Sequence, residues 1–303
     1  MKACYGDASS HSISQSLKAV SSRGGRHVRS APARRGLELP IRVFPVALTG
    51  SRIEFDSESS VSQNIYDNQA FFDGYARLPR SQFGLEAAPE WPAIQAMLPV
   101  LTGKRVLDLG CGYGWFCRRA RVAGAAKVLG IDLSEKMLAR ARELTEDTDI
   151  SYQRGDLEQL VLPSKAFDVV YSQLTLHYLP DIGPLFASIH QALPPGGWFV
   201  FTVEHPIYTC SPRQAWLTDE EGQRSWPVNN YQNEGKRVSN WLADGVVKYH
   251  RTLSTTLNAL IAAGFAIRHV NEWGPAAEQI EANPALAEEA ERPMMVLFSA
   301  QRL

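Results

Sequence analysis

The most informative part of this 303-residue chain is the run Arg105-Val106-Leu107-Asp108-Leu109-Gly110-Cys111-Gly112-Tyr113-Gly114. An apolar strand leads into an acidic residue and then into a glycine-rich turn that opens a helix. In an open α/β sheet, ligands bind beyond the carboxyl ends of the strands, and glycine lets a ligand approach the backbone closely. The run therefore predicts a nucleotide-like cofactor site, with Asp108, Gly110, Cys111 and Gly112 as binding candidates.

Two residues distinguish this turn from a dinucleotide site. The dinucleotide pattern G-x-G-x-x-G requires glycine at position 115, where this chain has Trp115. The carboxylate of Asp108 would repel a pyrophosphate, whereas it suits the ammonium group of an amino-acid ligand. The turn therefore favours a cofactor with an amino-acid group, S-adenosylmethionine (SAM), over NAD.

Two further acidic residues follow the next two expected strands. Asp132 ends the run Leu129-Gly130-Ile131-Asp132, where a carboxylate can accept hydrogen bonds from both hydroxyls of a ribose. Its alternative role is that of an acid at a helix N-terminus, which the helix dipole favours. Asp156, in Gly155-Asp156-Leu157, can accept a hydrogen bond from an adenine amino group or can be an ordinary turn aspartate.

Strands and helices alternate along the chain from residue 62, which predicts an α/β fold: a parallel sheet with helices on both faces. The expected strands are residues 105–109, 127–131, 150–153, 167–173, 198–203, 266–272 and 294–300. The expected helices are residues 64–78, 91–101, 114–123, 134–144, 182–193, 253–263 and 276–291. Residues 206–250, rich in Trp, Asn, Tyr and Gly, interrupt the alternation, and a long insertion there favours a lid or substrate-pocket wall.

Residues 1–60 differ from the rest in composition. They are basic and rich in Ser and Arg, and no helical or strand period persists, so we expect disorder. Their composition fits an organelle transit peptide or, in the interpretation we favour, an upstream stretch added by a misplaced start codon. The globular domain then spans residues 61–303. We expect a cytoplasmic location, with an organelle as the alternative if residues 1–60 are a transit peptide.

Charge and cysteine usage restrict the partners. Residues 1–61 hold nine Lys or Arg and five Asp or Glu, so the remainder of a chain with net charge −1 carries −5. An acidic domain argues against nucleic acid as the partner and favours a small molecule.

No apolar run approaches the roughly 18 residues of a membrane span. The four cysteines are scattered, which favours a reducing compartment and predicts no metal site.

Taken together, these motifs resemble the class I SAM-dependent methyltransferases, close to the small-molecule "type 11" group. The resemblance covers about residues 62–303, and the matching segments occur in the family's order. They are residues 106–112, 130–132, 155–157, 167–170 and 193–197. The resemblance implies a Rossmann-like, seven-stranded, mostly parallel sheet with its last strand antiparallel, a lid insertion after the fifth strand, and SAM as cofactor.

Matching positions assign the residues around the cofactor. The two glycines of the turn line the methionine part, Asp132 binds the ribose, and Asp156 and Leu157 flank the adenine. Family members often close an N-terminal helix over the cofactor, a role open to Tyr75, for which core packing is the alternative. The cofactor-binding candidates are Asp108, Gly110, Cys111, Gly112, Asp132, Leu133, Asp156, Leu157, Gln173 and Tyr75.

The catalytic residues are sought at the carboxyl ends of the middle strands. Methyl transfer is an in-line displacement, so a base is needed only where the acceptor loses a proton. His177, after the fourth strand, is the first candidate for general base or substrate orienter, with a loop-bonded histidine as the alternative. Glu204 and His205 follow the fifth strand and are further candidates, or else a loop-anchoring pair. Lys248 opens a basic run that either offers a cation to an acidic substrate or ends a solvated strand.

We therefore expect an enzyme that moves a methyl group from SAM to an O, N or C atom of a small organic acceptor. The acceptor and the oligomeric state are not specified by the sequence. The alternatives are a nucleic-acid or protein methyltransferase on the same fold, and a SAM-binding protein without turnover. Methylation of a nucleic-acid base is opposed by Gln173-Leu174-Thr175-Leu176, which stands where Asn-Pro-Pro-Tyr would follow the fourth strand. A nicotinamide oxidoreductase is opposed by Trp115 and Asp108.

Overall fold

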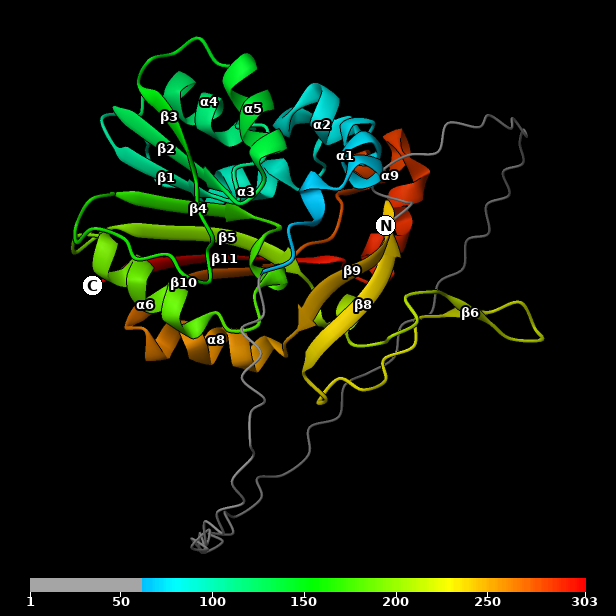
Figure 1. Cartoon of the computed structure of the whole chain (residues 1–303). Coiled ribbons are helices and arrows are strands. Elements are labelled where there is room, and N and C mark those ends of the chain that lie inside the picture. Colours follow the sequence, from blue (N-terminus) through cyan, green and yellow to red (C-terminus); the bar gives the residue numbers. More distant parts are fainter. Residues whose placement is uncertain (1–61) are drawn as a thin grey trace, which may run out of the picture. The chain divides into compact units, whose positions relative to one another are not determined.

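The computed structural model describes residues 62–303, so the prediction for residues 1–60 lies outside the described part. A seven-stranded sheet has the order β10-β11-β5-β4-β1-β2-β3 (Figure 1). Its strands are β1 (Arg105–Leu109), β2 (Lys127–Asp132), β3 (Ile150–Arg154), β4 (Val169–Gln173), β5 (Trp198–Glu204), β10 (Phe265–Glu272) and β11 (Met295–Arg302). Within this sheet β11 runs antiparallel to both of its neighbours, whereas β1 to β5 are parallel. The predicted Rossmann-like sheet is confirmed.

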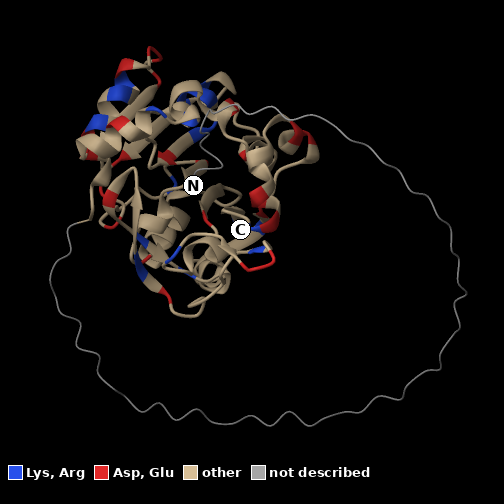
Figure 2. Cartoon of the chain, turned by 90° about the vertical axis from the view of Figure 1, so that its right-hand side faces the viewer, with Lys and Arg blue, Asp and Glu red and all other residues tan. Residues whose placement is uncertain are grey.

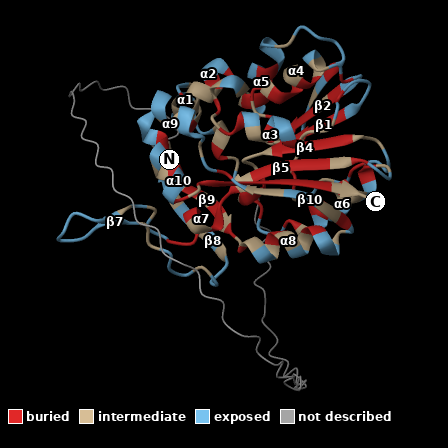
Figure 3. Ribbon diagram, turned by 180° about the vertical axis from the view of Figure 1, so that it is seen from behind, coloured by how far each residue is buried: buried red, intermediate tan, exposed pale blue. Residues whose placement is uncertain are grey.

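Helices cover both faces of the sheet, as predicted. One face packs against α3 (Trp91–Met97), α4 (Trp115–Val122) and α5 (Glu135–Glu143), and the other against α6 (Gly183–Ala192) and α8 (Leu253–Ala262). Successive strand residues alternate between the two cores: Val106 packs on the α4 side and Leu107 on the α6 side. Figure 3 shows the buried strands between helices whose outer faces are exposed. None of the helices described here is long and apolar enough to cross a membrane.

The segment before the sheet is more broken than the sequence predicts. It forms η2 (Ile65–Asp67), α1 (Gln69–Ala76), α2 (Pro79–Phe83) and η3 (Leu85–Ala87). The expected helix 64–78 begins only at Gln69, because the side chain of Asn68 accepts the Phe71 N–H at 3.1 Å and caps the helix there. Similarly, α3 ends at Met97, since Pro99 disfavours a helical conformation at Leu98.

The expected helix 276–291 is three short helices. They are α9 (Ala277–Ala282), η5 (Pro284–Leu286) and α10 (Ala287–Glu291). Pro284 has no N–H to continue the helix and disfavours the helical conformation at Asn283, which is extended. The prediction of one continuous helix is therefore wrong at this proline.

The insertion after β5 forms α7 and two hairpins. Its elements are α7 (Pro206–Thr209), β6 (Leu217–Thr218), β7 (Arg224–Ser225), β8 (Gly235–Trp241) and β9 (Ala243–His250). The β8–β9 hairpin packs against η4 (Leu176–Tyr178), which follows β4, and Val246 joins a small core with Ile65 and Phe71. In Figure 1 this hairpin lies at the end of the sheet where β4 and β5 finish. Movement of the insertion as a lid remains a prediction.

Candidate active site

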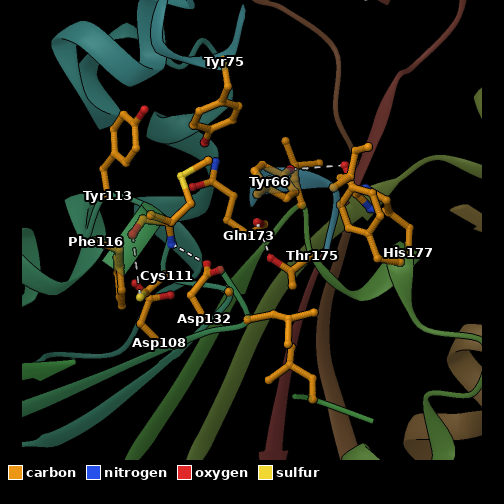
Figure 4. A pocket seen from close by; sticks show the side chains of 18 of the residues that line it. Tyr66, Tyr75, Asp108, Cys111, Tyr113, Phe116, Asp132, Gln173, Thr175 and His177 are labelled. Carbon is orange, nitrogen blue, oxygen red and sulfur yellow. Dashed lines mark hydrogen bonds between the residues drawn. The ribbon is translucent and has the colours of Figure 1, made fainter. Parts of the chain in front are cut away.

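A continuous pocket lies beyond the carboxyl ends of β1, β2 and β4 (Figure 4). The β1–α4 turn, the end of β2 and the segment after β3 form one part of its lining. The N-terminal segment, η4 and the β8–β9 hairpin form the rest. The pocket therefore brings together elements that are separated by almost the whole described sequence.

Gly110 and Gly112 lie in the turn between β1 and α4, and a side chain is unfavourable at each of them for a different reason. Gly110 and Gly112 have φ values of +74° and +52°, which L side chains rarely adopt. A Cβ on Gly110 would lie 2.1 Å from Thr175 Oγ1, so packing of the protein itself excludes a side chain there. A Cβ on Gly112 would meet nothing closer than the Tyr75 hydroxyl at 3.9 Å. Gly112 thus leaves open space in the pocket where a ligand can approach the backbone.

Asp132 is held at the end of β2 by backbone N–H groups. Its Oδ2 accepts the Gly112 N–H at 2.8 Å, and its Oδ1 accepts the Ser134 N–H at 2.9 Å. Burial raises the pKa of Asp132 to about 6, although these N–H groups oppose the rise. Each carboxylate oxygen has a further lone pair, so the oriented carboxyl can still accept ligand hydroxyls.

Asp108 lies at the end of β1 and is only 2% exposed. It lines the pocket and accepts a hydrogen bond from Cys117 Sγ at 3.3 Å on Oδ2. Burial raises the pKa of Asp108 to about 7, and the charge of Asp132 contributes to the rise. A cation bound beside it would favour the ionised carboxylate.

The predicted adenine side of the pocket is assembled as a group. Asp156, Leu157 and Leu133 all line it. Asp156 accepts the Ser62 hydroxyl at 2.7 Å on Oδ2 and the Glu158 N–H at 3.0 Å on Oδ1. The carboxyl of Asp156 is therefore fixed in place by two neighbouring segments.

Gln173 belongs to a buried network that sequence reasoning missed. Its Nε2 donates to Glu90 Oε1 at 2.9 Å, and its Oε1 accepts the Tyr171 hydroxyl at 2.9 Å. Glu90 is fully buried and forms an ion pair with Arg80 at 2.6 Å. Arg80 on α2 lines the pocket. No motif marks Arg80, because α2 precedes the strand–helix alternation from which the site was predicted.

An aromatic group faces the glycine turn. The ring of Tyr75 on α1 makes edge contacts with Tyr113 at 5.7 Å and with Tyr66 at 5.5 Å between centroids. Figure 4 shows Tyr75 and Tyr113 across the pocket from Asp108 and Asp132. Tyr75 packs with other aromatic residues and also lines the pocket, and its closure over the cofactor stays a prediction.

The other end of the pocket holds a buried ion pair. Lys248 Nζ lies 2.5 Å from Glu204 Oε1, and the two side chains are 4% and 5% exposed. Although burial alone would raise the pKa of Glu204, the adjacent ammonium holds it below its usual value. Glu204 Oε2 is buried with no hydrogen-bond donor among the described residues. The expectation of a solvated strand end is therefore wrong for Lys248, whose ammonium is buried and paired with Glu204.

His177 lies beside this ion pair and lines the pocket. Its Nδ1 accepts the Glu204 N–H at 3.4 Å, which leaves Nε2 as the protonated nitrogen of the neutral ring. Burial lowers the pKa of His177 to about 4, with further lowering by Lys248 and Arg251. A neutral ring that carries its proton on Nε2 fits the predicted role of substrate orienter better than that of general base.

His205 lies outside the pocket lining. Its Nδ1 accepts the Ile207 N–H at 3.0 Å and caps α7, and its Nε2 lies 2.8 Å from Glu272 Oε1. Both ring nitrogens are thus engaged within the fold. This placement fits the loop-anchoring alternative rather than a catalytic role.

Comparison with known proteins agrees with this geometry. Residues 107–201 match a family model described as a methyltransferase domain. A crystal structure of a SAM-dependent methyltransferase from Mesorhizobium loti is 58% identical, with a TM-score of 0.70, and the match covers 72% of this chain and 100% of that one. An uncharacterized protein of Haemophilus influenzae is 35% identical over 248 residues, which is 79% of this chain and 97% of that protein. The chain belongs to the SAM-dependent methyltransferases, in the type 11 group of the class I fold.

Relatives with named substrates match over shorter stretches. The malonyl-[acyl-carrier protein] O-methyltransferase of Erwinia billingiae is 37% identical over 100 residues, which is 33% of this chain and 39% of that protein. The family model over residues 107–201 includes the glycine turn and Asp132. SAM is therefore the cofactor of this chain, whereas the acceptor has to be argued from its own pocket.

Proposed function

We propose that this protein transfers a methyl group from SAM to an O, N or C atom of a small organic molecule. The observation that carries the proposal is the continuity of the pocket, which joins the glycine turn to the buried Glu204–Lys248 pair. One end offers a cofactor cradle and the other offers polar groups to an acceptor. Cofactor and acceptor can therefore meet within one enclosure, as an in-line displacement requires.

The cofactor end fits SAM in shape and charge. The open space at Gly112 admits the methionine part, and the Asp132 carboxyl is oriented to accept ribose hydroxyls. Asp108 offers a carboxylate to the ammonium group of SAM, and Arg80, which also lines the pocket, offers a guanidinium to its carboxylate. The pocket lining contains five carboxyl groups and two permanent cations, which suits a cofactor with a net positive charge.

The residues at the acceptor end of the pocket can orient the methyl acceptor and take up its proton. In the transfer, the acceptor's lone pair forms the new bond to the methyl carbon while the sulfur–methyl bond breaks, and that electron pair stays on sulfur. Where the acceptor must lose a proton, Glu204 is the ionised group positioned to take it. His177 donates from Nε2 and orients the acceptor, because its basic nitrogen, Nδ1, already accepts the Glu204 N–H.

A nucleic-acid substrate fits the surface less well. Residues 62–303 carry a net charge of −5, and Figure 2 shows their Lys and Arg interspersed with Asp and Glu in that view. Phosphate binding relies on concentrated cations. These features support a small acceptor over the nucleic-acid alternative.

The test is the formation of S-adenosylhomocysteine by the full chain. The protein is incubated with SAM and, in separate reactions, with a small-molecule extract, with RNA, with DNA and with denatured protein, and the product is measured by mass spectrometry. We expect product only with the small-molecule extract, and less product from the Asp132→Ala variant at the same SAM concentration. Product with a macromolecular fraction would refute the proposal. SAM binding without product in any reaction would instead identify a SAM-binding protein without turnover.

A further inference from the structure

The charges at the acceptor end of the pocket cancel each other. Lys248 is the cation at this end, and its ammonium is already bound to Glu204 Oε1 at 2.5 Å. The second cation of the lining, Arg80, lies on α2 and is paired with Glu90. Among the described residues that line this pocket, a negatively charged acceptor would therefore find no uncommitted cation beside Glu204. Arg251 lines a neighbouring pocket instead and donates hydrogen bonds to the carbonyls of Leu176 and Leu179.

The ion pair with Lys248 nevertheless leaves the second carboxylate oxygen of Glu204 in need of a hydrogen-bond donor. Its side chain is 95% buried, and Oε2 has no donor within residues 62–303 although Glu204 lines the pocket. A buried carboxylate oxygen without a hydrogen bond costs free energy, so a donor on a ligand seated at this end is stabilising. Lys248 already balances the charge, and that donor need not carry a charge of its own.

The walls around the ion pair are flat and aromatic. Lys248 Nζ lies 5.1 Å from the centroid of the Trp241 ring and 5.9 Å from that of Tyr178. The hydroxyls of Tyr66 and Tyr178 are 3.2 Å apart. The lysine therefore takes the position over these rings that a cationic ligand would prefer. Neutral aromatic ligands can still pack against the ring edges.

We propose that the acceptor end selects a neutral aromatic molecule whose hydroxyl group donates a hydrogen bond to Glu204, and that the Glu204–Lys248 pair excludes carboxylates. This inference rests on the proposed function, because it names the acceptor class of the same pocket. Lys248 acts here as a positioning residue that keeps the Glu204 carboxylate ionised. A neutral aromatic acceptor would thus differ from a malonyl group, which carries a negatively charged carboxylate.

The test uses three matched probes: 2-naphthol, 2-naphthoate and 2-naphthylmethylamine. They share one ring system and differ in whether the group presented to the protein is neutral, anionic or cationic. Each is titrated calorimetrically into the full chain saturated with S-adenosylhomocysteine. We expect 2-naphthol to bind at least tenfold more tightly than either charged probe. Equal or tighter binding of 2-naphthoate or 2-naphthylmethylamine, or no binding of 2-naphthol, would overturn the inference.

The Glu204→Gln variant tests the ion pair itself. Removal of the carboxylate releases the Lys248 ammonium, so we expect 2-naphthol to weaken about tenfold and 2-naphthoate to gain about tenfold. The Glu204→Gln/Lys248→Met double variant removes both charges, in case a lone buried lysine prevents folding, and it should lose the 2-naphthol preference without gaining 2-naphthoate. Glu272→Gln makes the same change at a half-exposed position outside the pocket and should leave all three affinities unchanged. An unchanged preference in both Glu204 variants would contradict the role of the pair.

Binding of S-adenosylhomocysteine distinguishes a failure of the proposed methyltransferase function from a failure of the proposed acceptor class. If the wild-type chain fails to bind it, the proposed function fails and the inference fails with it. If it binds while the probes rank in another order, only the acceptor inference is overturned.

Discussion

Replacing Gly112 with alanine separates backbone strain from loss of the cofactor cradle. Gly112 has φ = +52°, and a Cβ there would be 3.9 Å from the nearest protein atom outside its own neighbours. The strain of an L residue in this region destabilises the fold by about 1–2 kcal/mol. Because the added methyl clashes with no protein atom, its remaining effect falls on the ligand. Overpacking by one methyl typically costs about 1–3 kcal/mol, which corresponds to roughly 5- to 150-fold weaker SAM binding.

Gly103→Ala is the matched control. Gly103 also has a left-handed φ, +72°, and open space around the position of a Cβ, but it lies outside the pocket. Unfolding in urea should show a similar loss of stability in both variants, whereas calorimetric titration with SAM should show weakened binding only in Gly112→Ala. Equal SAM affinity in the two variants would refute the assignment of Gly112 as the open part of the cradle.

Three further predictions follow from the site. Asp132→Ala should weaken SAM binding by about 1–3 kcal/mol through lost charged hydrogen bonds, while Asp149→Asn at an exposed site should not; unchanged affinity in a folded Asp132→Ala protein would remove the ribose assignment. The raised pKa of Asp108, about 7, means that the cofactor-free protein holds a proton that an ammonium ligand expels, so SAM affinity should rise as the pH increases from about 6 to 7, and a flat profile would contradict this. Because the pKa of Asp108 is raised in the folded state, that state binds more protons than the unfolded state. The free energy of unfolding of the cofactor-free protein should therefore fall between about pH 6 and 7. Lys248→Met should destabilise the fold by about 3–5 kcal/mol, because it leaves a buried carboxylate uncompensated, and Glu204→Gln/Lys248→Met should recover most of the loss in urea unfolding; an undiminished single variant would count against the ion pair.

The sheet and the cofactor end of the pocket were predictable because their signals are local. Consecutive apolar residues in β1 and β4 indicate strands that are buried on both faces, and the backbone at Gly110 and Gly112 admits few residues other than glycine. Ser134 illustrates the same point, since its side chain accepts the Met137 N–H and caps α5 at the start of the helix expected over residues 134–144. Each of these features depends on residues close together in the chain.

The acceptor end was less predictable because it depends on long-range contacts. Glu204 and Lys248 are 44 positions apart, and their pairing requires the β8–β9 hairpin to return to the end of β5. Arg80 reaches the pocket from a short helix without a motif. His205 follows Glu204 directly, yet the chain turns into α7 at that point and carries its ring away from the pocket. Adjacent positions in the sequence therefore did not share one role.

The most direct test of the central claim is calorimetric titration of the full chain with SAM, S-adenosylhomocysteine and NAD. The acidic pocket, the open Gly112 and the oriented Asp132 predict micromolar binding of both sulfur cofactors and no binding of NAD. NAD binding, or the absence of binding by either sulfur cofactor, would contradict the account.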